Sequence, residues 1–214
     1  MGKDATTSVY LITPPRVDDP LAFAEQLKLA LDAGGGDCVQ LRLKDADDDT
    51  IRRAADVLRP PTQERDVAFI MNDRPDLARE TGCDGVHIGQ DDARYVEARE
   101  LLGPDAIIGV TCKASRHLAI DAAEAGADYV AFGAFFGSTT KAGTVQASSE
   151  LLTWWCETTN VPCVAIGGIT PANCGPLVLA GADFLAVISS VWSHTKGPGS
   201  AMAEFRLAIA AAAH

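Results

Sequence analysis

Polar side chains follow apolar runs at three places in the first half of this chain, and their types suit a bound phosphate and a metal ion. The three segments are Gln40-x-Arg42-x-Lys44, Asn72-Asp73 and Gln90-Asp91-Asp92. In a parallel α/β protein the carboxyl ends of the strands open onto one face, so these groups can converge on one ligand. Because Mg2+ is commonly held by one or two carboxylates together with substrate phosphates, the combination predicts a magnesium–diphosphate site.

The first segment supplies one amide and two cations. Gln40, Arg42 and Lys44 are two residues apart, so in an extended strand they face one side. We interpret Arg42 and Lys44 as phosphate ligands, and Gln40 as the group that reads a polar heterocycle or orients its neighbours. A strand at the surface would also alternate polar residues, and this is the structural alternative.

The carboxylates are open to two interpretations. An aspartate that opens a helix is usually an N-cap, which is the structural interpretation of Asp73, Asp91 and Asp92 taken singly. Two carboxylates on adjacent strand ends, beside two cations, favour metal binding instead. We therefore predict that Asp73 and Asp92 bind Mg2+.

Two later segments have the composition of phosphate-binding loops. Residues 133–143 combine glycines and hydroxyls with Lys141, although such loops are also common connectors. Gly167-Gly168 and Ile188-Ser189 end two further apolar runs, and the loops after strands seven and eight are the usual phosphate site of a barrel. A second phosphate region separate from the metal site indicates two phosphorylated substrates.

The elements that must position these groups alternate along the chain. Predicted strands are 9–13, 38–43, 67–72, 85–88, 107–111, 129–133, 163–167 and 184–189. Predicted helices are 20–32, 48–58, 75–81, 93–102, 115–125, 149–158, 171–180 and 199–213. The alternation predicts an α/β protein, a (β/α)8 TIM barrel that forms a single domain over residues 1–214.

Two further patterns bear on this fold. A doubly wound sheet is the rival, but no Gly-x-Gly-x-x-Gly follows the first predicted strand. The phrase Ala-Gly-Ala-Asp occurs at 125–128 and at 180–183, each time between a helix and a strand. We interpret it as structural, because glycine ends the helix and small alanines allow close packing.

Composition limits the classes of partner. The net charge of −11 argues against nucleic acid and anionic membrane surfaces as partners. The six cysteines include no C-x-x-C pair, and no apolar run approaches the length needed to cross a bilayer. We therefore expect reduced thiols and a cytoplasmic location. The four histidines form no metal-binding pattern, and His87 is interpreted as structural or solvated.

Six motifs in order resemble the thiamine-phosphate synthase family over about residues 9–191. They are Gln40-x-Arg42-x-Lys44, Asn72-Asp73, Gly85-Val86-His87-Ile88-Gly89-Gln90-x-Asp92, Thr140-Lys141, Gly167-Gly168-Ile169 and Ile188-Ser189. The resemblance implies a transferase that joins a hydroxymethylpyrimidine diphosphate to a hydroxyethylthiazole phosphate, giving thiamine phosphate and diphosphate. It also implies Mg2+ on Asp73 and Asp92.

Site residues follow from the same resemblance. The implied pyrimidine-diphosphate contacts are Gln40, Arg42, Lys44, Asn72, Thr111 and Lys141. The implied thiazole-phosphate contacts are Ser138, Thr140, Gly168, Ile188 and Ser189. The family is understood to lose diphosphate first, leaving a pyrimidine-methyl cation that the thiazole nitrogen captures. Arg42, Lys44 and Lys141 are the expected catalytic residues, because they would stabilise the leaving diphosphate.

The chain departs from the family at a few positions. Leu43 stands where glutamate is usual, Lys113 where histidine is common, and Gly137-Ser138 where Pro-Thr is usual; Thr111 replaces serine but keeps the hydroxyl. Leu43 is expected to point away from the cleft. Two alternatives stay open: a thiazole tautomerase paralogue, and a non-catalytic barrel that binds thiamine precursors. A homo-oligomer is also possible, because barrels of this size often pair.

Overall fold

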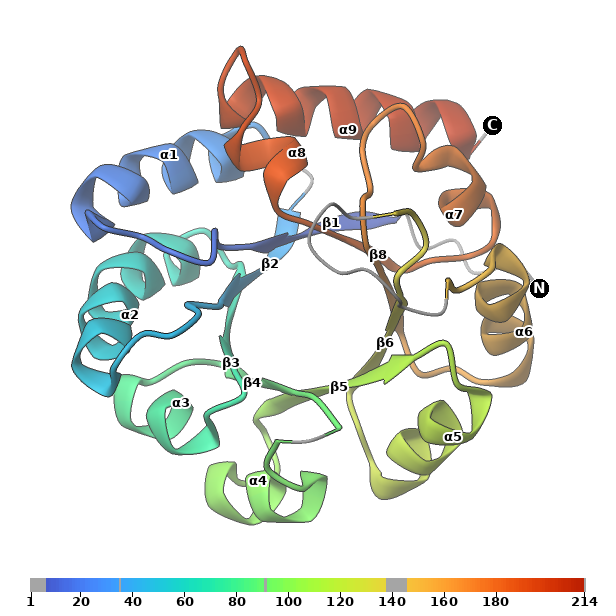
Figure 1. Ribbon diagram of the computed structural model, residues 1–214, viewed down its shortest axis with the longest axis horizontal. Coiled ribbons are helices and arrows are strands. Elements are labelled where there is room, and N and C mark those ends of the chain that lie inside the picture. Colours follow the sequence, from blue (N-terminus) through green and yellow to red (C-terminus); the bar gives the residue numbers. More distant parts are fainter. Residues whose placement is uncertain (1–6, 35, 91, 138–145, 214) are drawn as a thin grey trace.

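Eight parallel strands close into a barrel, and helices surround it as an outer ring (Figure 1). The computed structural model describes residues 7–34, 36–90, 92–137 and 146–213. The strands are β1 (Ser8–Ile12), β2 (Gly36–Leu41), β3 (Ala68–Asn72), β4 (Gly85–Ile88), β5 (Ile107–Lys113), β6 (Tyr129–Gly133), β7 (Cys163–Ile166) and β8 (Phe184–Val187). The predicted (β/α)8 barrel is confirmed, and the doubly wound alternative is excluded.

The helices follow the strands in turn. They are α1 (Pro20–Asp32), α2 (Asp48–Gln63), α3 (Pro75–Thr81), α4 (Tyr95–Leu102), α5 (Arg116–Ala125), α6 (Ser149–Thr158), α7 (Gly175–Leu179), α8 (Ser189–Trp192) and α9 (Pro198–Ala212). Most expected boundaries agree with these to within two residues. The short helix α8 was not predicted, because its four residues were assigned to the last strand and the loop after it.

Strand residues alternate between two apolar cores. Val9 and Leu11 of β1 belong to the large core between the strands and the helices, whereas Tyr10 and Ile12 belong to the smaller core inside the barrel. This is the two-residue period of a strand. The inward-facing residues of neighbouring strands therefore decide what lies beneath the mouth of the barrel.

The Ala-Gly-Ala-Asp phrases stabilise the end of the barrel opposite the predicted site. The Asp128 carboxylate accepts the backbone N–H of Ile108 at 2.8 Å, and Asp183 accepts that of Cys163 at 2.8 Å. Each aspartate thus satisfies a part-buried backbone amide near the start of the preceding strand. The structural interpretation of the repeat is confirmed.

Helix α2 continues past the predicted end at Leu58, through Pro60 and Pro61 to Gln63. The predicted end was wrong, because the two prolines remove only the N–H groups that would bond the Asp56 and Val57 carbonyls, and the chain keeps its helical path. The Thr62 hydroxyl donates to the Leu58 carbonyl at 2.8 Å, and the Arg65 guanidinium donates to the Pro61 carbonyl at 2.8 Å. These side-chain donors add hydrogen bonds to carbonyls in the last turns of the helix.

Two predicted elements are shorter than expected. Strand β2 ends at Leu41, because the next amide donates to the Thr13 side chain at 2.9 Å instead of continuing the strand ladder. The helix predicted over 171–180 is reduced to α7. Asn173 occupies the preceding turn, where its side chain accepts from Thr170 N and donates to Gly168 O.

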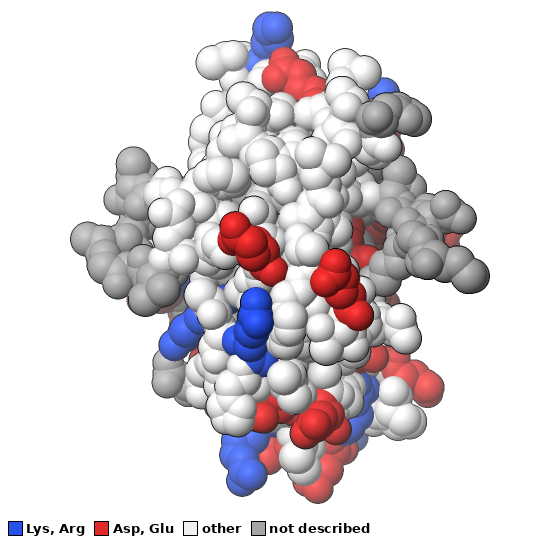
Figure 2. Space-filling view, turned by 90° about the vertical axis from the view of Figure 1, so that its right-hand side faces the viewer, with Lys and Arg blue, Asp and Glu red and all other residues white. Residues whose placement is uncertain are grey.

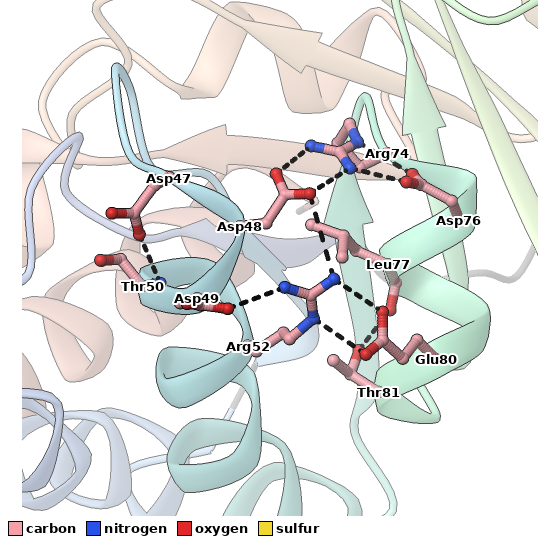
Figure 3. Close-up of polar contacts among 10 residues, drawn as sticks. All are labelled: Asp47, Asp48, Asp49, Thr50, Arg52, Arg74, Asp76, Leu77, Glu80 and Thr81. Carbon is pink, nitrogen blue, oxygen red and sulfur yellow. Dashed lines mark hydrogen bonds and ion pairs between the residues drawn. The ribbon is translucent and has the colours of Figure 1, made fainter.

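A cluster of ion pairs ties α2 to the segment after β3 (Figure 3). Arg74 forms paired bonds with Asp48 of α2 and with Asp76 of α3, and Arg52 of α2 reaches Glu80 of α3 at 2.8 Å. These paired carboxylates raise the pKa of Arg74. Since Arg74 directly follows Asp73, the cluster anchors the loop that carries a predicted metal ligand.

Charge is unevenly distributed over the surface. Figure 2 shows the side of the barrel on which α6 and α7 lie, and its upper half carries few charged side chains. Leu179 at the end of α7 is among the exposed large apolar residues. Among the described residues, no helix has both the length and the apolar composition that spanning a bilayer requires.

Candidate active site

A chain of hydrogen bonds crosses the interior of the barrel beneath its carboxyl-terminal mouth. The Gln40 amide donates to the Tyr10 hydroxyl at 3.0 Å, and the Tyr10 and Tyr129 hydroxyls are 2.7 Å apart. Tyr129 lies 3.0 Å from Nδ1 of His87, whose Nε2 lies 2.7 Å from the Thr111 hydroxyl. The groups come from β2, β1, β6, β4 and β5, so this row of hydrogen bonds can form only when the barrel is closed.

Because these side chains are buried, each of their polar atoms needs a hydrogen-bond partner inside the protein. Gln40, Tyr10, Tyr129 and His87 are all less than 9% exposed, with values of 3%, 2%, 7% and 8%. A buried polar atom without a partner costs about 1–3 kcal/mol. Each of these side chains has a hydrogen-bond partner among the others. We call this hydrogen-bonded row the polar floor of the predicted cleft.

The Tyr129 ring fits only because the neighbouring strand has a glycine. A Cβ built on Gly109 would lie 1.9 Å from the ring of Tyr129. The ring also packs edge-on against Tyr10 and stacks on His87, with centroids 5.8 and 5.5 Å apart. Gly109 of β5 is therefore part of what positions the floor.

We expect Gly109→Ala to lower the free energy of unfolding by about 2–3 kcal/mol, because the added methyl group displaces the Tyr129 ring. Urea unfolding measures this loss. Gly175→Ala is the matched control, since its added methyl group would meet its nearest neighbour, Ala212 Cβ, at an ordinary 3.8 Å. Equal midpoints for the two variants would contradict the packing described here.

The floor is electrically neutral. The pKa of His87 is lowered to about 4: burial is the largest influence and lowers it, Asp92 raises it, and Arg42 lowers it. Burial also raises the pKa of Tyr10 and of Tyr129 well above 10.0. At neutral pH the histidine is therefore an imidazole and both phenols keep their protons.

The protonation of His87 predicts an acid-sensitive fold. Its pKa is depressed in the folded state, so its contribution is complete above pH 6.5 and is lost as the pH falls toward 4. The difference between 6.5 and about 4 corresponds to about 3 kcal/mol. Urea unfolding between pH 7 and 4 should show this loss, and His87→Asn should flatten it. His117→Asn changes an exposed histidine and should leave the pH dependence of the free energy of unfolding as in wild-type protein. A wild-type pH dependence in His87→Asn would contradict the assignment of this loss to His87.

The predicted metal ligands do lie together. The Asp73 and Asp92 carboxyl groups are within hydrogen-bonding reach, and burial together with Asp92 raises the pKa of Asp73 to about 6. Asn72 and Arg42 oppose this rise. Asp92 is held from below by the backbone N–H of Gly89 at 2.8 Å. Two carboxylates so close repel each other unless a proton or a cation lies between them.

Neither carboxylate caps a helix. The N-cap residue of α3 is Arg74 and that of α4 is Arg94, so the capping interpretation of Asp73 and Asp92 is wrong. Asp73 also has a left-handed backbone, with φ of 62°, while its N–H donates to the His87 carbonyl at 2.8 Å. A non-glycine residue held in this conformation is strained, and such strain concentrates at functional sites.

The two predicted phosphate-binding cations follow β2 and do not belong to it. The alternation of the strand nevertheless continues past its end, because Leu41 and Leu43 both pack in the outer core. Phosphate binding by Arg42 and Lys44 stays a prediction. Arg42 is half-buried and acts on both Asp73 and His87 electrostatically, whereas Lys44 is exposed. Leu43 packs against the outer core, as expected.

Thr111 and Lys113 lie at the end of β5, where the pairing with β6 shifts register. Thr111 is half-buried and closes the polar floor, and Gln90 donates to its carbonyl at 2.6 Å. Lys113 is exposed, and its φ of 53° is again left-handed. The bulge leaves the intervening Cys112 fully buried.

The second predicted phosphate region lies at the ends of β7 and β8, which pair with each other. Gly167 and Gly168 have φ values of 110° and 62°, so this turn requires glycine at both positions. Ile188 precedes α8, and Ser189 is the exposed first residue of that helix. Asn173 fixes the turn by donating to the Gly168 carbonyl.

Three predicted site residues, Ser138, Thr140 and Lys141, lie outside the described residues, as does Asp91. The remaining predicted residues lie near or just after the carboxyl ends of strands, on one face of the closed barrel. Sequence reasoning missed Tyr10, Tyr129 and the interior position of His87. The alternation of β1, β4 and β6 was the signal that could have placed them inside the barrel.

The fold and the site define a class before any comparison is made. A (β/α)8 barrel with a carboxylate pair, a facing guanidinium and a glycine turn at its carboxyl-terminal mouth has the form of a barrel enzyme that acts on phosphorylated compounds. Comparison with known sequences narrows this class. The family model described as thiamine monophosphate synthase matches residues 9–191.

Individual relatives agree with the family model. The thiamine-phosphate synthase of Rhodospirillum centenum is 64% identical over 197 residues, covering 92% of this chain and 95% of the relative. That of Hyphomonas neptunium is 51% identical, covering 93% and 92%. The solved structure of thiamine phosphate pyrophosphorylase from Pyrococcus furiosus superposes with a TM-score of 0.85 at 30% identity, covering 97% of each chain.

The chain belongs to the thiamine-phosphate synthase family. It is accordingly a transferase of thiamine biosynthesis, which acts on two small molecules. The resemblance inferred from six short motifs is confirmed.

Proposed function

We propose that the chain joins a hydroxymethylpyrimidine diphosphate to a hydroxyethylthiazole phosphate, with loss of diphosphate, by a dissociative substitution assisted by Mg2+. The observation that carries the proposal is the Asp73–Asp92 pair, which faces Arg42 above a neutral polar floor. The pair supplies the charge of a metal site, and the floor supplies the hydrogen bonds of a heterocycle pocket.

The residues present fit a magnesium ion. Asp73 and Asp92 offer carboxylate oxygens within reach of each other, and burial together with the neighbouring Asp92 raises the pKa of Asp73. A divalent cation would relieve the repulsion between the two carboxylates, and hard oxygen ligands are those that Mg2+ prefers. When bound, Mg2+ would offset negative charge on the diphosphate as it leaves.

The chain's own cations would share this work. Arg42 is held by its backbone to Thr13 at 2.9 Å and lies near enough to Asp73 to lower the pKa of that residue. Its planar guanidinium can bind two phosphate oxygens at once. Lys44, and Lys141 from the sequence prediction, would add single-point contacts, and Asn72 would orient Asp73 through the bond that it donates to it.

The pyrimidine would lie over the floor, with the Gln40 amide and the Thr111 hydroxyl at the two ends of the buried chain. The thiazole phosphate would bind at the Gly167-Gly168 turn, beside Ile188 and Ser189, with Ser138 and Thr140 as further expected contacts. The left-handed glycines leave room for a phosphate to approach the backbone there.

The proposed chemistry needs no general base. The bond between the pyrimidine methylene and the diphosphate oxygen breaks, and its electron pair leaves with the diphosphate. The thiazole nitrogen then donates its lone pair to the resulting pyrimidine-methyl cation. His87 is neutral and buried, with both ring nitrogens hydrogen-bonded, so it is placed to hold the floor together and not to exchange protons.

Turnover with both phosphorylated precursors and Mg2+ tests the proposal. We expect thiamine phosphate and diphosphate in equal amounts, with activity lost on chelation and restored by Mg2+. Isomerisation of the thiazole phosphate alone would support the tautomerase alternative. Tight binding of the thiazole phosphate without any product would support a non-catalytic barrel. Either result would overturn the proposed reaction.

A further inference from the structure

We propose that the buried row of hydrogen bonds runs in a single direction. Each group donates a hydrogen bond to the next, in the order Gln40, Tyr10, Tyr129, His87 and Thr111. His87 is then a positioning residue that carries its proton on Nε2, and the Thr111 hydroxyl is left to donate its own proton into the cleft. The ligand that receives this proton rests on the proposed function, but the direction itself does not.

The first half of the argument comes from counting protons. Gln40 Nε2 can only donate, and it donates to the Tyr10 oxygen. A phenol has one proton, and the remaining neighbours of the Tyr10 hydroxyl are the Tyr129 oxygen at 2.7 Å and the Cys38 thiol. The phenolic oxygen is a stronger acceptor than a thiol sulfur, so Tyr10 donates to Tyr129. If Tyr129 donated to Tyr10 instead, the Tyr10 oxygen would accept twice and its buried proton would be left with the weak sulfur acceptor.

The second half comes from the imidazole. Tyr129 has accepted from Tyr10, so its own proton goes to Nδ1 of His87 at 3.0 Å. A neutral imidazole has one N–H, which must then be on Nε2, 2.7 Å from the Thr111 oxygen. The lowered pKa of His87 agrees with a neutral ring. Thr111 thus accepts from His87, and its hydroxyl proton remains for another acceptor.

The free proton suits the cleft that Thr111 borders. A diphosphate has oxygen acceptors and, when fully ionised, no donor, so a hydroxyl that faces it must donate. In the reverse direction the Thr111 hydroxyl would donate its hydrogen bond to His87, and only its lone pairs would face the anion. At the other end of the chain, the Gln40 carbonyl oxygen is left to accept from a donor such as a ring amino group.

The direction can be measured without substrate. In protein labelled with 15N-histidine, the two ring nitrogens of each histidine have distinct shifts that identify the protonated one, and His87→Asn assigns the His87 signals among four histidines. We expect His87 to be an Nε2–H imidazole at pH 7 in the free protein. An Nδ1–H imidazole, or an imidazolium, would overturn the proposal. This result is independent of whether the proposed reaction is correct.

Two matched variants test whether the direction is set by the hydroxyls. Tyr129→Phe removes the donor to Nδ1, so we expect the Nδ1–H form of His87 to appear. Tyr10→Phe removes a hydroxyl of equal size from the same core but leaves Tyr129 to donate to Nδ1, so His87 should stay Nε2–H. A purely packing role predicts no such difference. Equal tautomer populations in the two variants would contradict the proposal.

Activity gives the third reading. We expect Tyr129→Phe to lower kcat about tenfold, the usual size of an orienting effect, with the KM for the thiazole phosphate unchanged. Thr111→Ser should keep most of kcat/KM because the hydroxyl remains, whereas the isosteric Thr111→Val should lose at least about tenfold. Equal activities of Thr111→Ser and Thr111→Val would show that no proton is donated from this residue.

Discussion

Asp92→Asn is expected to abolish most activity while stabilising the metal-free protein. The change removes one of two carboxylates proposed to hold Mg2+, and we expect kcat/KM to fall at least about 100-fold. It also removes the charge that, together with burial, raises the pKa of Asp73. In the presence of chelator at pH 7, the free energy of unfolding should therefore rise by about 1 kcal/mol, a value reduced for the solvent exposure of Asp92.

The two effects have opposite signs, which separates a functional role from a general loss of folding. Asp105→Asn is the matched control, because Asp105 is an exposed carboxylate just before β5, at the opposite end of the barrel. That variant should change neither activity nor stability appreciably. Steady-state assays and urea unfolding with chelator measure both quantities. An Asp92→Asn protein that is both active and destabilised would contradict the site.

Arg42→Gln is expected to lower kcat by about 100-fold or more, the second largest effect. The guanidinium would stabilise charge that develops on the departing diphosphate, so its loss acts on the bond-breaking step. Its backbone bond to Thr13 does not depend on the side chain, so the loop should keep its place. Single-turnover measurements with saturating precursors and Mg2+ would isolate this step.

Arg53→Gln provides the comparison, because Arg53 is an exposed cation on α2 whose guanidinium donates to the Thr50 hydroxyl of the same helix. It removes the same charge from the chain without touching the mouth. If both variants slowed turnover equally, the effect would be one of overall charge. A normal single-turnover rate in Arg42→Gln would remove this residue from the proposed chemistry.

The barrel and the carboxylate pair were predictable from the sequence because each depends on local pattern and strand order. Asp73 and Asp92 follow adjacent strands, and parallel strands of a closed barrel bring their carboxyl ends together whatever the detailed packing. Helix α1 was predicted with its correct bounds, from a proline at its start and a glycine-rich stop at its end.

The polar floor was not predictable in the same way. Tyr10 and Tyr129 are 119 residues apart and meet only because β1 and β6 face each other across the barrel. Strand alternation could have placed each tyrosine inside the barrel, but nothing local indicates that their hydroxyls meet. The end of β2 likewise depends on a distant side chain, because the Arg42 amide donates to the Thr13 hydroxyl. Such a contact is tertiary, so periodicity does not show it.

Cation binding in the presence of diphosphate tests the central claim most directly. Mn2+ can stand in for Mg2+ at oxygen sites, and electron paramagnetic resonance counts the free ion. We predict one Mn2+ per chain in wild-type protein with diphosphate, weakened at least about tenfold in Asp92→Asn and unchanged in Asp105→Asn. Equal Mn2+ affinity in wild-type protein and Asp92→Asn would contradict a metal–diphosphate site at Asp73 and Asp92.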